Sequence, residues 1–491
     1  MPKLLLLLAL LAAGCSAAGP DYTRPEIDLP GEWSQTRDPA LTPNKEEIRN
    51  WWRVFRDPVL NRLIQDAAGQ NLDLRSAVAR VDEARAKLKE ARGGYWPSID
   101  TSGAAARQES RGTELQPQGT LDTYYTAGME AGWELDLFGR IRRSVQASSA
   151  DFQASQEERT DIMISVYAEV ARTYINIRTL QSRLDTTRKN ITSQKEILGL
   201  TRARFKHGLA SDLDVARAEQ VLANTRAQIP PLRTELTESK NSLAILLGLP
   251  PGELEETLGE SGKIPVPPER TAYGVPADLL RRRPDIRSAE RSLAAQTARI
   301  GVAEAELYPA FSLTGSLDYM HTGLNDMFIP AHRAFSFGPS VRWNLFNGGR
   351  IRAQIEVEDA RTEQALAAYE KTVLTALSEV ENAATGYWQQ KDQLAALRDA
   401  VQACKRSLHL AERLYKDGLS DFQNVLDAQR ELFSAEDRLD AGRGSAAMYM
   451  VDLYRALGGG WNPQAGKSDM HPGPAKDNDH PEKSPNKGDQ G

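Results

Sequence analysis

The chain has 491 residues, of which 26% are charged and 40% hydrophobic, and its formal net charge at pH 7 is −6. This balance is ordinary for a folded protein and argues against nucleic-acid binding, which usually needs a basic face. Aromatic residues make up only 7%, while Ala, Leu, Arg and Glu are abundant, which favours long helices. A single compact core of this size would be large, so an elongated or repeated architecture is predicted.

The first residues have the features of an export signal. The apolar run at residues 4–13 is far shorter than the roughly 18 residues of a membrane-spanning helix. The sequence that follows resembles a bacterial lipoprotein cleavage site, which implies a signal peptide at 1–14 and a lipidated Cys15. Ala12 stands where that pattern usually has Leu, so an ordinary signal peptide with an incidental Cys is the alternative. Ser16 after the Cys implies sorting to the outer membrane.

The chain contains two copies of one unit, about 210 residues apart. A constant offset over such a span indicates that a structural unit has been duplicated. The matching pairs are WELDLFGRIR at 133–142 with WNLFNGGRIR at 343–352, FKHGL at 205–209 with YKDGL at 415–419, and RSA at 75–77 with RSA at 287–289.

Each copy contains a very long helical stretch. From Arg140 onward about 65 residues lack Pro, and apolar residues recur at steps of three and four, near coiled-coil spacing. A helix of that length is roughly 100 Å long, too long for a compact domain. A turn centred on Gly208 or Gly418 ends each stretch, and one second helix then returns to Gly248 or Gly458 in a C-terminal capping position.

Four segments alternate apolar and polar residues with a period of two. They lie at 99–107, 125–137, 311–319 and 335–345. The alternation suits a wall between lipid and water, and it equally suits the sheet of a soluble sandwich. No apolar run beyond the signal approaches the length of a spanning helix, so crossing a membrane would require a closed β-barrel. Four strands are too few to close a barrel, whereas three protomers would supply twelve strands and an aqueous lumen.

These features together predict six segments. They are the signal peptide at 1–14, an extended N-terminal segment at 15–60, a first repeat at 61–248 with its hairpin at about 95–137, a linker at 249–278, a second repeat at 279–461 with its hairpin at about 308–346, and a disordered C-terminal tail at 462–491.

The sequence carries no recognisable catalytic or metal-binding motif. It has no His-Glu-x-x-His, no Gly-x-Ser-x-Gly and no complete phosphate loop, and its six His residues lack metal-ligand spacing. We therefore predict that the protein is not an enzyme, has no catalytic residues and no metal site, and uses no cofactor.

The chain resembles the TolC-like outer-membrane efflux proteins, in the lipoprotein branch of the OprM and NodT type. The markers are C-x-x-x-G-P-D-Y-x-R-P at 15–25, the duplicated Gly-Arg-Ile-Arg, RPDIR at 283–287 and VLDAQR at 425–430. The resemblance covers nearly everything from Cys15 to Trp461. It implies a mixed α+β fold, in which duplicated long-helix coiled-coil hairpins form a periplasmic α-barrel and four strands per protomer enter a trimeric 12-stranded transmembrane β-barrel.

The resemblance also implies a function and partners. It implies a homotrimer in the Gram-negative outer membrane, anchored by a covalent lipid on Cys15, with its helices in the periplasm. Such a trimer is the exit duct of a tripartite efflux pump, joined through a periplasmic adapter to a proton-driven inner-membrane transporter of the RND type, and it passively conducts drugs or other small molecules. The exit duct of a type I protein secretion system is the alternative, and a periplasm-spanning structural lipoprotein is a third possibility.

Two groups of residues match functional motifs of the family. The first group, at the helical turns, matches the motif that docks the adapter: Gly208, Leu209, Ala210, Gly418, Leu419 and Ser420. The second matches the periplasmic gate: Tyr415, Gln423, Asp427 and Arg430. Three copies of Asp427 around an axis would form a ring that favours cations. The alternatives are a purely structural role for the turns and a solvated Asp427, and Gln423 stands where better-known members place an apolar Leu.

Overall fold

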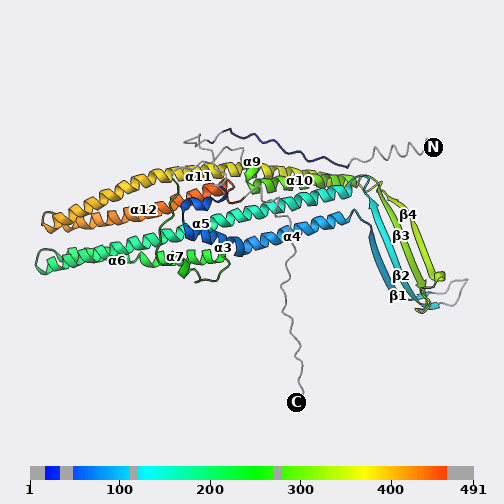
Figure 1. The fold of residues 1–491 in the computed structure, drawn as a ribbon, viewed down its shortest axis with the longest axis horizontal. Helices are drawn as coiled ribbons and strands as arrows, with labels where there is room; N and C mark the ends of the chain where they lie inside the picture. The colour runs from blue at the N-terminus through cyan, green and yellow to red at the C-terminus, as the bar shows by residue number, and fades with distance from the viewer. Residues whose placement is uncertain (1–16, 32, 34–47, 111–119, 269–278, 462–491) are drawn as a thin grey trace, which may run out of the picture.

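The computed structural model describes residues 17–31, 33, 48–110, 120–268 and 279–461. The predicted signal peptide, the predicted lipidation site at Cys15, the predicted tail at 462–491 and part of the predicted linker lie outside the described residues. Within the described ranges the helices lie side by side as one long body, and the strands project from one end of it (Figure 1).

The first repeat contains helices on both sides of a hairpin. Its α5 has 67 residues and confirms the predicted long helix. The elements in order are η1 (Trp51–Phe55), α3 (Pro58–Gln70), α4 (Leu72–Gly93), β1 (Ser98–Ser110), β2 (Thr120–Leu135), α5 (Arg140–Lys206), α6 (Asp212–Arg226), α7 (Ile229–Leu246) and, in the linker, α8 (Glu255–Leu258).

The second repeat has the same plan. Its α11 also has 67 residues and its α12 has 35. The elements in order are α9 (Leu279–Arg282), α10 (Pro284–Ala305), β3 (Ala310–His321), η3 (Pro330–His332), β4 (Arg333–Arg342), α11 (Arg350–Lys416) and α12 (Phe422–Ala456).

The return path differs between the two repeats. The sequence predicts one return helix in each copy, and this is confirmed for α12 but wrong for the first copy, where α6 ends at Arg226 and α7 begins at Ile229. Pro230 and Pro231 cause the break, because proline lacks the backbone donor that a helix interior needs but is tolerated in a first turn.

The strands form one four-stranded antiparallel sheet in the order β1-β2-β3-β4. The pairing of β2 with β3 joins the two repeats, with Met129 opposite Leu317. Strands β2 and β4 end at Leu135 and Arg342, short of the alternation that the sequence places through 137 and 345.

A duplicated hydrogen bond fixes both hairpins to their preceding helices. The indole nitrogen of Trp133 donates to the carbonyl of Tyr95, and that of Trp343 donates to the carbonyl of Leu307, each at 3.0 Å. The two copies therefore agree in detail as well as in outline, and the predicted mixed α+β fold with duplicated hairpins is confirmed.

The main hydrophobic core lies near the middle of the helical body, around η1, α3 and α7 (Figure 1). We call this middle region the equator. There η1, α3, α5, α7, α11 and α12 bury side chains that include Trp51, Leu60, Ile175, Leu243 and Met450. A smaller cluster of buried residues lies near the helical turns at the end remote from the sheet. None of the helices within the described ranges has a stretch both long and apolar enough for a membrane span.

Candidate functional site at the helical tips

The turns that follow α5 and α11 form two tips with the same backbone geometry. Gly208 and Gly418 have φ values of +73° and +75°, a conformation that glycine adopts without steric cost. In each turn the next amide donates back into the helix, as in a Schellman motif. These bonds run from the Leu209 amide to the Arg204 carbonyl (2.9 Å) and from the Leu419 amide to the Leu414 carbonyl (2.8 Å).

Each tip presents one exposed leucine. Leu209 is 65% exposed and Leu419 is 75% exposed, while Ala210 and Ser420 are half-buried. The glycines shape the turns, but the leucines remain largely uncovered in the protomer. The tips therefore combine a fixed backbone with paired apolar projections, and the predicted docking role stays a prediction.

Three of the four predicted gate residues lie together on α12. The side-chain amide of Gln423 donates to the Oδ1 atom of Asp427 at 2.9 Å, and a guanidinium nitrogen of Arg430 lies 3.3 Å from the same oxygen. Neighbours at these spacings share one helix face. Gln423, which replaces the expected apolar residue, thus holds the carboxylate from one side while Arg430 holds it from the other.

Tyr415 lies apart from this group. It is buried near the end of α11, where its ring packs 5.1 Å from the ring of Phe422, against Val425 and Leu426. Burial raises the pKa of the Tyr415 hydroxyl, and the nearby Arg204 opposes the rise. Tyr415 is therefore a packing residue at the base of the tip, and the structure does not place it beside Asp427.

The structure adds a residue that the sequence did not single out. The guanidinium of Arg204, in the last turn of α5, lies 4.6 Å from the centroid of the Tyr415 ring and donates to the carbonyl of Tyr415 at 3.1 Å. Its sequence signal is only that of a basic residue near a helix C-terminus, which is common and unspecific.

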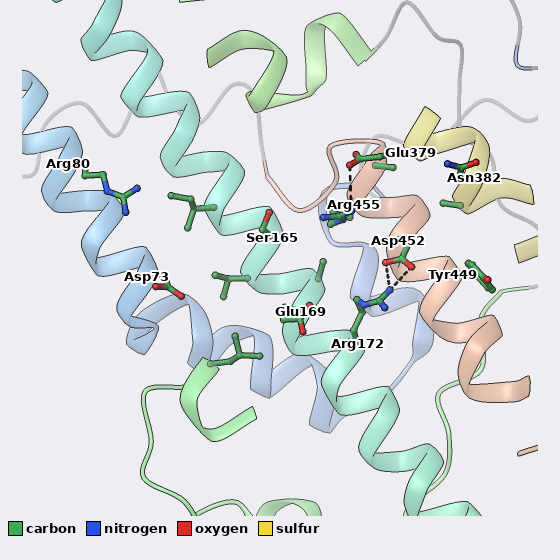
Figure 2. Close-up of a pocket in the computed structure, with 16 residues that line it drawn as sticks. Asp73, Arg80, Ser165, Glu169, Arg172, Glu379, Asn382, Tyr449, Asp452 and Arg455 are labelled. Atoms are coloured by element: carbon green, nitrogen blue, oxygen red, sulfur yellow. Dashed lines mark hydrogen bonds and ion pairs between the residues drawn. The ribbon is translucent and has the colours of Figure 1, made fainter. Parts of the chain in front are cut away.

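A polar cleft lies at the equator, between α4, α5, α11 and α12 (Figure 2). Its volume is about 830 Å³. Arg172 forms an ion pair with Asp452, and Arg455 lies 3.8 Å from Glu379. Leu246 of α7 also lines the cleft, so five helices contribute to it and no local sequence motif predicts it. In the described part of the chain, no group of three or more His, Cys, Asp or Glu residues could hold a metal ion.

The N-terminal segment is clamped where the helices meet the sheet. Arg143, buried in α5, donates at 2.8 Å to the carbonyls of Ala18 and Gly19 and to the carboxylate of Asp21. Gly19 lies so close to Gly301 that an added Cβ would be 2.4 Å from the Gly301 Cα. Gly139 is similarly close to Ala17, so the described part of the first sequence marker, from residue 17, contacts the start of the Gly-Arg-Ile-Arg at 139–142.

Comparisons with known proteins agree with this geometry. A family model described as outer membrane efflux protein matches residues 63–249 and 275–459, close to the two predicted repeats. The toluene efflux pump outer membrane protein TtgC of Pseudomonas putida is 33% identical over 485 residues, covering 96% of this chain and 98% of that protein.

Two further proteins are similar over nearly their whole length. Nodulation protein T of Rhizobium leguminosarum bv. trifolii is 32% identical over 459 residues, covering 93% of this chain and 97% of that protein. The solved structure of the outer-membrane channel OprN superposes with a TM-score of 0.83 at 35% identity, covering 90% of this chain and 99% of that one.

Proposed function

Because this chain belongs to the outer membrane efflux protein family, we propose that three copies of it build the exit duct of a tripartite efflux pump. The chain is an outer-membrane efflux channel, a conduit and not an enzyme. Relatives named for the efflux of toluene support small organic molecules as cargo. Those names favour efflux over the alternative of protein secretion.

The main support for a homotrimer comes from the four-stranded sheet. Its outer strands β1 and β4 each pair on one side only within the described sheet. Along β4, Phe335 and Phe337 are 74% and 77% exposed, while Ser336 points to the opposite face and lies 3.1 Å from the Ser316 hydroxyl. One apolar and one polar face suit a wall between lipid and water, and three such sheets joined edge to edge supply the strands that one protomer lacks.

A covalent lipid on Cys15 is the second part of the proposal. The clamp of Arg143 on Ala18 and Gly19 holds the segment after Cys15 against the junction of the helices and the sheet. Exposed aromatic side chains, among them Trp96 and Trp343, lie at the same junction, as expected near a membrane surface. This arrangement supports an outer-membrane anchor at the level where the helical body begins.

The tips are the third part. We infer that the exposed Leu209 and Leu419 dock a periplasmic adapter, which links the duct to a proton-driven inner-membrane transporter of the RND type. In the trimer, three copies of Asp427 form the ring that favours cations at the periplasmic end. The exposure of Asp427, with Gln423 and Arg430 holding its carboxylate, supports this role.

A crosslinking experiment tests the proposed function. Leu209→Glu with Leu419→Glu should abolish crosslinking between the trimer and its adapter, because charged groups replace the apolar projections. Ile245→Glu is the matched control, since Ile245 is also exposed (69%) but lies on α7, away from the tips. Each variant must still form heat-modifiable trimers that conduct ions in planar bilayers. Unchanged crosslinking would remove the docking assignment, and the lack of a conducting wild-type trimer would remove the duct itself.

A further inference from the structure

Two stacked histidine rings lie at the base of the loop between β3 and β4. Strand β3 ends at His321, and η3, directly before β4, ends at His332. The centroids of the two imidazole rings lie 3.8 Å apart, with 13° between the ring planes. The loop stands at the end of the sheet that is remote from the helical body (Figure 1). The two rings therefore close the base of this loop.

Hydrogen bonds to the backbone assign the protonated nitrogen of each neutral ring. The Nδ1 atom of His321 accepts from the Gly323 amide at 2.9 Å, and an amide N–H can only donate, so this nitrogen is unprotonated. The Nδ1 atom of His332 lies 2.9 Å from the Asp326 carbonyl, which can only accept, so this nitrogen carries the proton. The neutral pair satisfies both backbone groups without any charge.

Each ring can also accept a second proton. The Nδ1 atom of His321 lies 3.0 Å from the Gly323 carbonyl, so the protonated ring can donate to that carbonyl in place of accepting from the amide. His332 takes its proton at Nε2, the nitrogen that does not bind Asp326. A single charge is compatible with the stack, because the other ring is neutral. Two charged rings at this spacing repel each other.

The surroundings of the pair do not offset a second positive charge. Within the described residues, the two rings contact each other and form hydrogen bonds only to the backbone of Gly323 and Asp326. The charged or titratable groups on the neighbouring elements are Tyr125 of β2, which is opposite His321, Asp318 and Tyr319 of β3, Asp326 of the loop and Arg333 of β4.

The rest of the loop is held weakly. The amides of Met327 and Ile329 lie 3.5 Å and 3.4 Å from the carbonyls that they face, which is long for a hydrogen bond. Met327 is buried, and the ring of Phe328 packs on that of Tyr319 at 5.4 Å, but Phe328 remains 67% exposed. The closed form of the loop therefore depends on the histidine stack.

We propose that His321 and His332 form a pH-sensitive clasp, which keeps the β3–β4 loop closed while at most one ring is charged and releases it in acid, when both are. Histidine suits this role because it is the side chain that ordinarily changes its charge between about pH 5 and 8. The placement of the loop at the outer mouth of the duct rests on the proposed function, whereas the clasp itself does not. In that placement, acid outside the cell loosens the mouth.

The mobility of a spin label on the loop is the first test. Leu324→Cys in a Cys404→Ser background of the lipidated full-length protein places the label on a side chain that is 60% exposed. The mobile fraction should rise about fivefold from about pH 7.5 to about pH 5, the factor expected from two unit charges about 4 Å apart in water. A mobile fraction that is equal at both pH values would overturn the clasp.

Uncharged variants separate the charge from the packing. His332→Phe keeps a flat ring and His332→Asn keeps a donor for the Asp326 carbonyl, and neither can be protonated, so both should lose the pH response. His409→Phe is the matched control, because His409 is exposed on α11 and remote from the sheet, and it should keep the full response. A response that survives in both His332 variants would show that other groups open the loop.

Conductance in planar bilayers tests the placement of the loop. Acid added only on the side of the loop should raise the conductance of the wild-type trimer but not that of His332→Phe. A label that becomes mobile while the conductance stays constant would remove the loop from the mouth of the duct. A wild type that does not conduct at either pH would remove the proposed function, and the label mobility would still decide whether the clasp exists.

Discussion

At the equator, the first turn of α4 in the first repeat and the first turn of α10 in the second occupy equivalent positions, and each is preceded by a buried polar residue. The side-chain amide of Asn71 donates to the carbonyl of Leu246 at the end of α7, at 2.8 Å. The guanidinium of Arg283 donates to the carbonyl of Ala456 at the end of α12, at 2.9 Å. Both pairs correspond at the duplication offset of about 210 residues. The repeats thus keep one contact to a helix C-terminus while exchanging a neutral donor for a charged one.

The exchange changes the surroundings of two acidic residues in each copy. In the second repeat, Asp285 and Glu379 are half-buried and each accepts a hydrogen bond from Arg283 at 2.7 Å. Their counterparts in the first repeat are Asp73 and Glu169, which are exposed and line the equatorial cleft (Figure 2).

The comparison shows how two copies of a duplicated unit can keep the same contact to a helix end and still differ in charge. A buried arginine requires carboxylates close by, since an unpaired buried charge is costly, whereas a buried asparagine does not. The first repeat can therefore leave its acidic side chains in water. The tips also differ by an exchange between a charged and an uncharged residue, because Arg204 of the first copy corresponds to Leu414 of the second.

The largest expected effect on stability follows from replacing Arg283, the charged residue of the equivalent pair Asn71 and Arg283. Arg283→Met should lower the free energy of unfolding by about 3 kcal/mol, because Asp285 and Glu379 are partly buried and both lose the charged hydrogen bond from Arg283, although Arg455 remains 3.8 Å from Glu379. Thermal melting of the detergent-solubilised protein measures the loss. A variant that also carries Asp285→Asn and Glu379→Gln should recover most of it. A loss that persists in the combined variant would mean that packing, and not unpaired charge, makes Arg283 important.

A smaller loss of stability is expected from replacing Asn71, the uncharged residue of the pair. Asn71→Ala should cost about 1–2 kcal/mol, because it removes the bond to the Leu246 carbonyl and the N-cap of α4, where the Asn71 side chain accepts from the Leu74 amide at 2.9 Å. Asn71→Asp keeps the cap but loses the donor, so its melting midpoint should fall between those of Asn71→Ala and the wild type. Equal losses for Arg283→Met and Asn71→Ala would contradict the distinction between the two repeats.

Much of the architecture could be predicted because its signals are local or periodic. The long helices follow from apolar spacing without proline, and the tips follow from Gly208 and Gly418, since a left-handed turn favours glycine. The duplicated Gly-Arg-Ile-Arg locates both junctions between the sheet and the helices. Even the break before α7 had a signal, the adjacent Pro230 and Pro231, but the strong match between the copies favoured a continuous helix.

The remaining features depend on contacts between distant segments. The match to a family motif selects both Tyr415 and Asp427, but it does not show which residues they contact. In the structure Tyr415, on α11, packs against Arg204, whereas Asp427, on α12, accepts a hydrogen bond from Gln423. The correspondence of Asn71 with Arg283 is visible in the sequence only after the structure shows that both donate to helix ends. Residue types that differ between repeats leave no repeated pattern to detect.

The smallest expected effect concerns an acidic residue of the first repeat that faces the charged cluster of the second. Asp161 lies on α5, and burial raises the pKa of its carboxyl to about 6, with a further rise from the neighbouring Asp285. Glu379 adds to this rise, while Arg283 and Arg455 lower the pKa. The pKa of Asp161 therefore depends on the balance between the negative charges of Asp285 and Glu379 and the positive charges of Arg283 and Arg455.

The sign of the pH dependence follows from that shift. The folded-state pKa is above the unfolded value of about 3.9, so the folded protein binds the proton more tightly, and this group stabilises the fold as the pH falls from 7 toward 5. The gain should be about 1 kcal/mol, since the side chain keeps some contact with water. Asp161→Asn cannot titrate, so its melting midpoint should exceed that of the wild type at pH 7, and the gap should narrow at pH 5. A gap that stays constant over this range would show that Asp161 is ionised throughout, and that the arginines of the second repeat outweigh its burial.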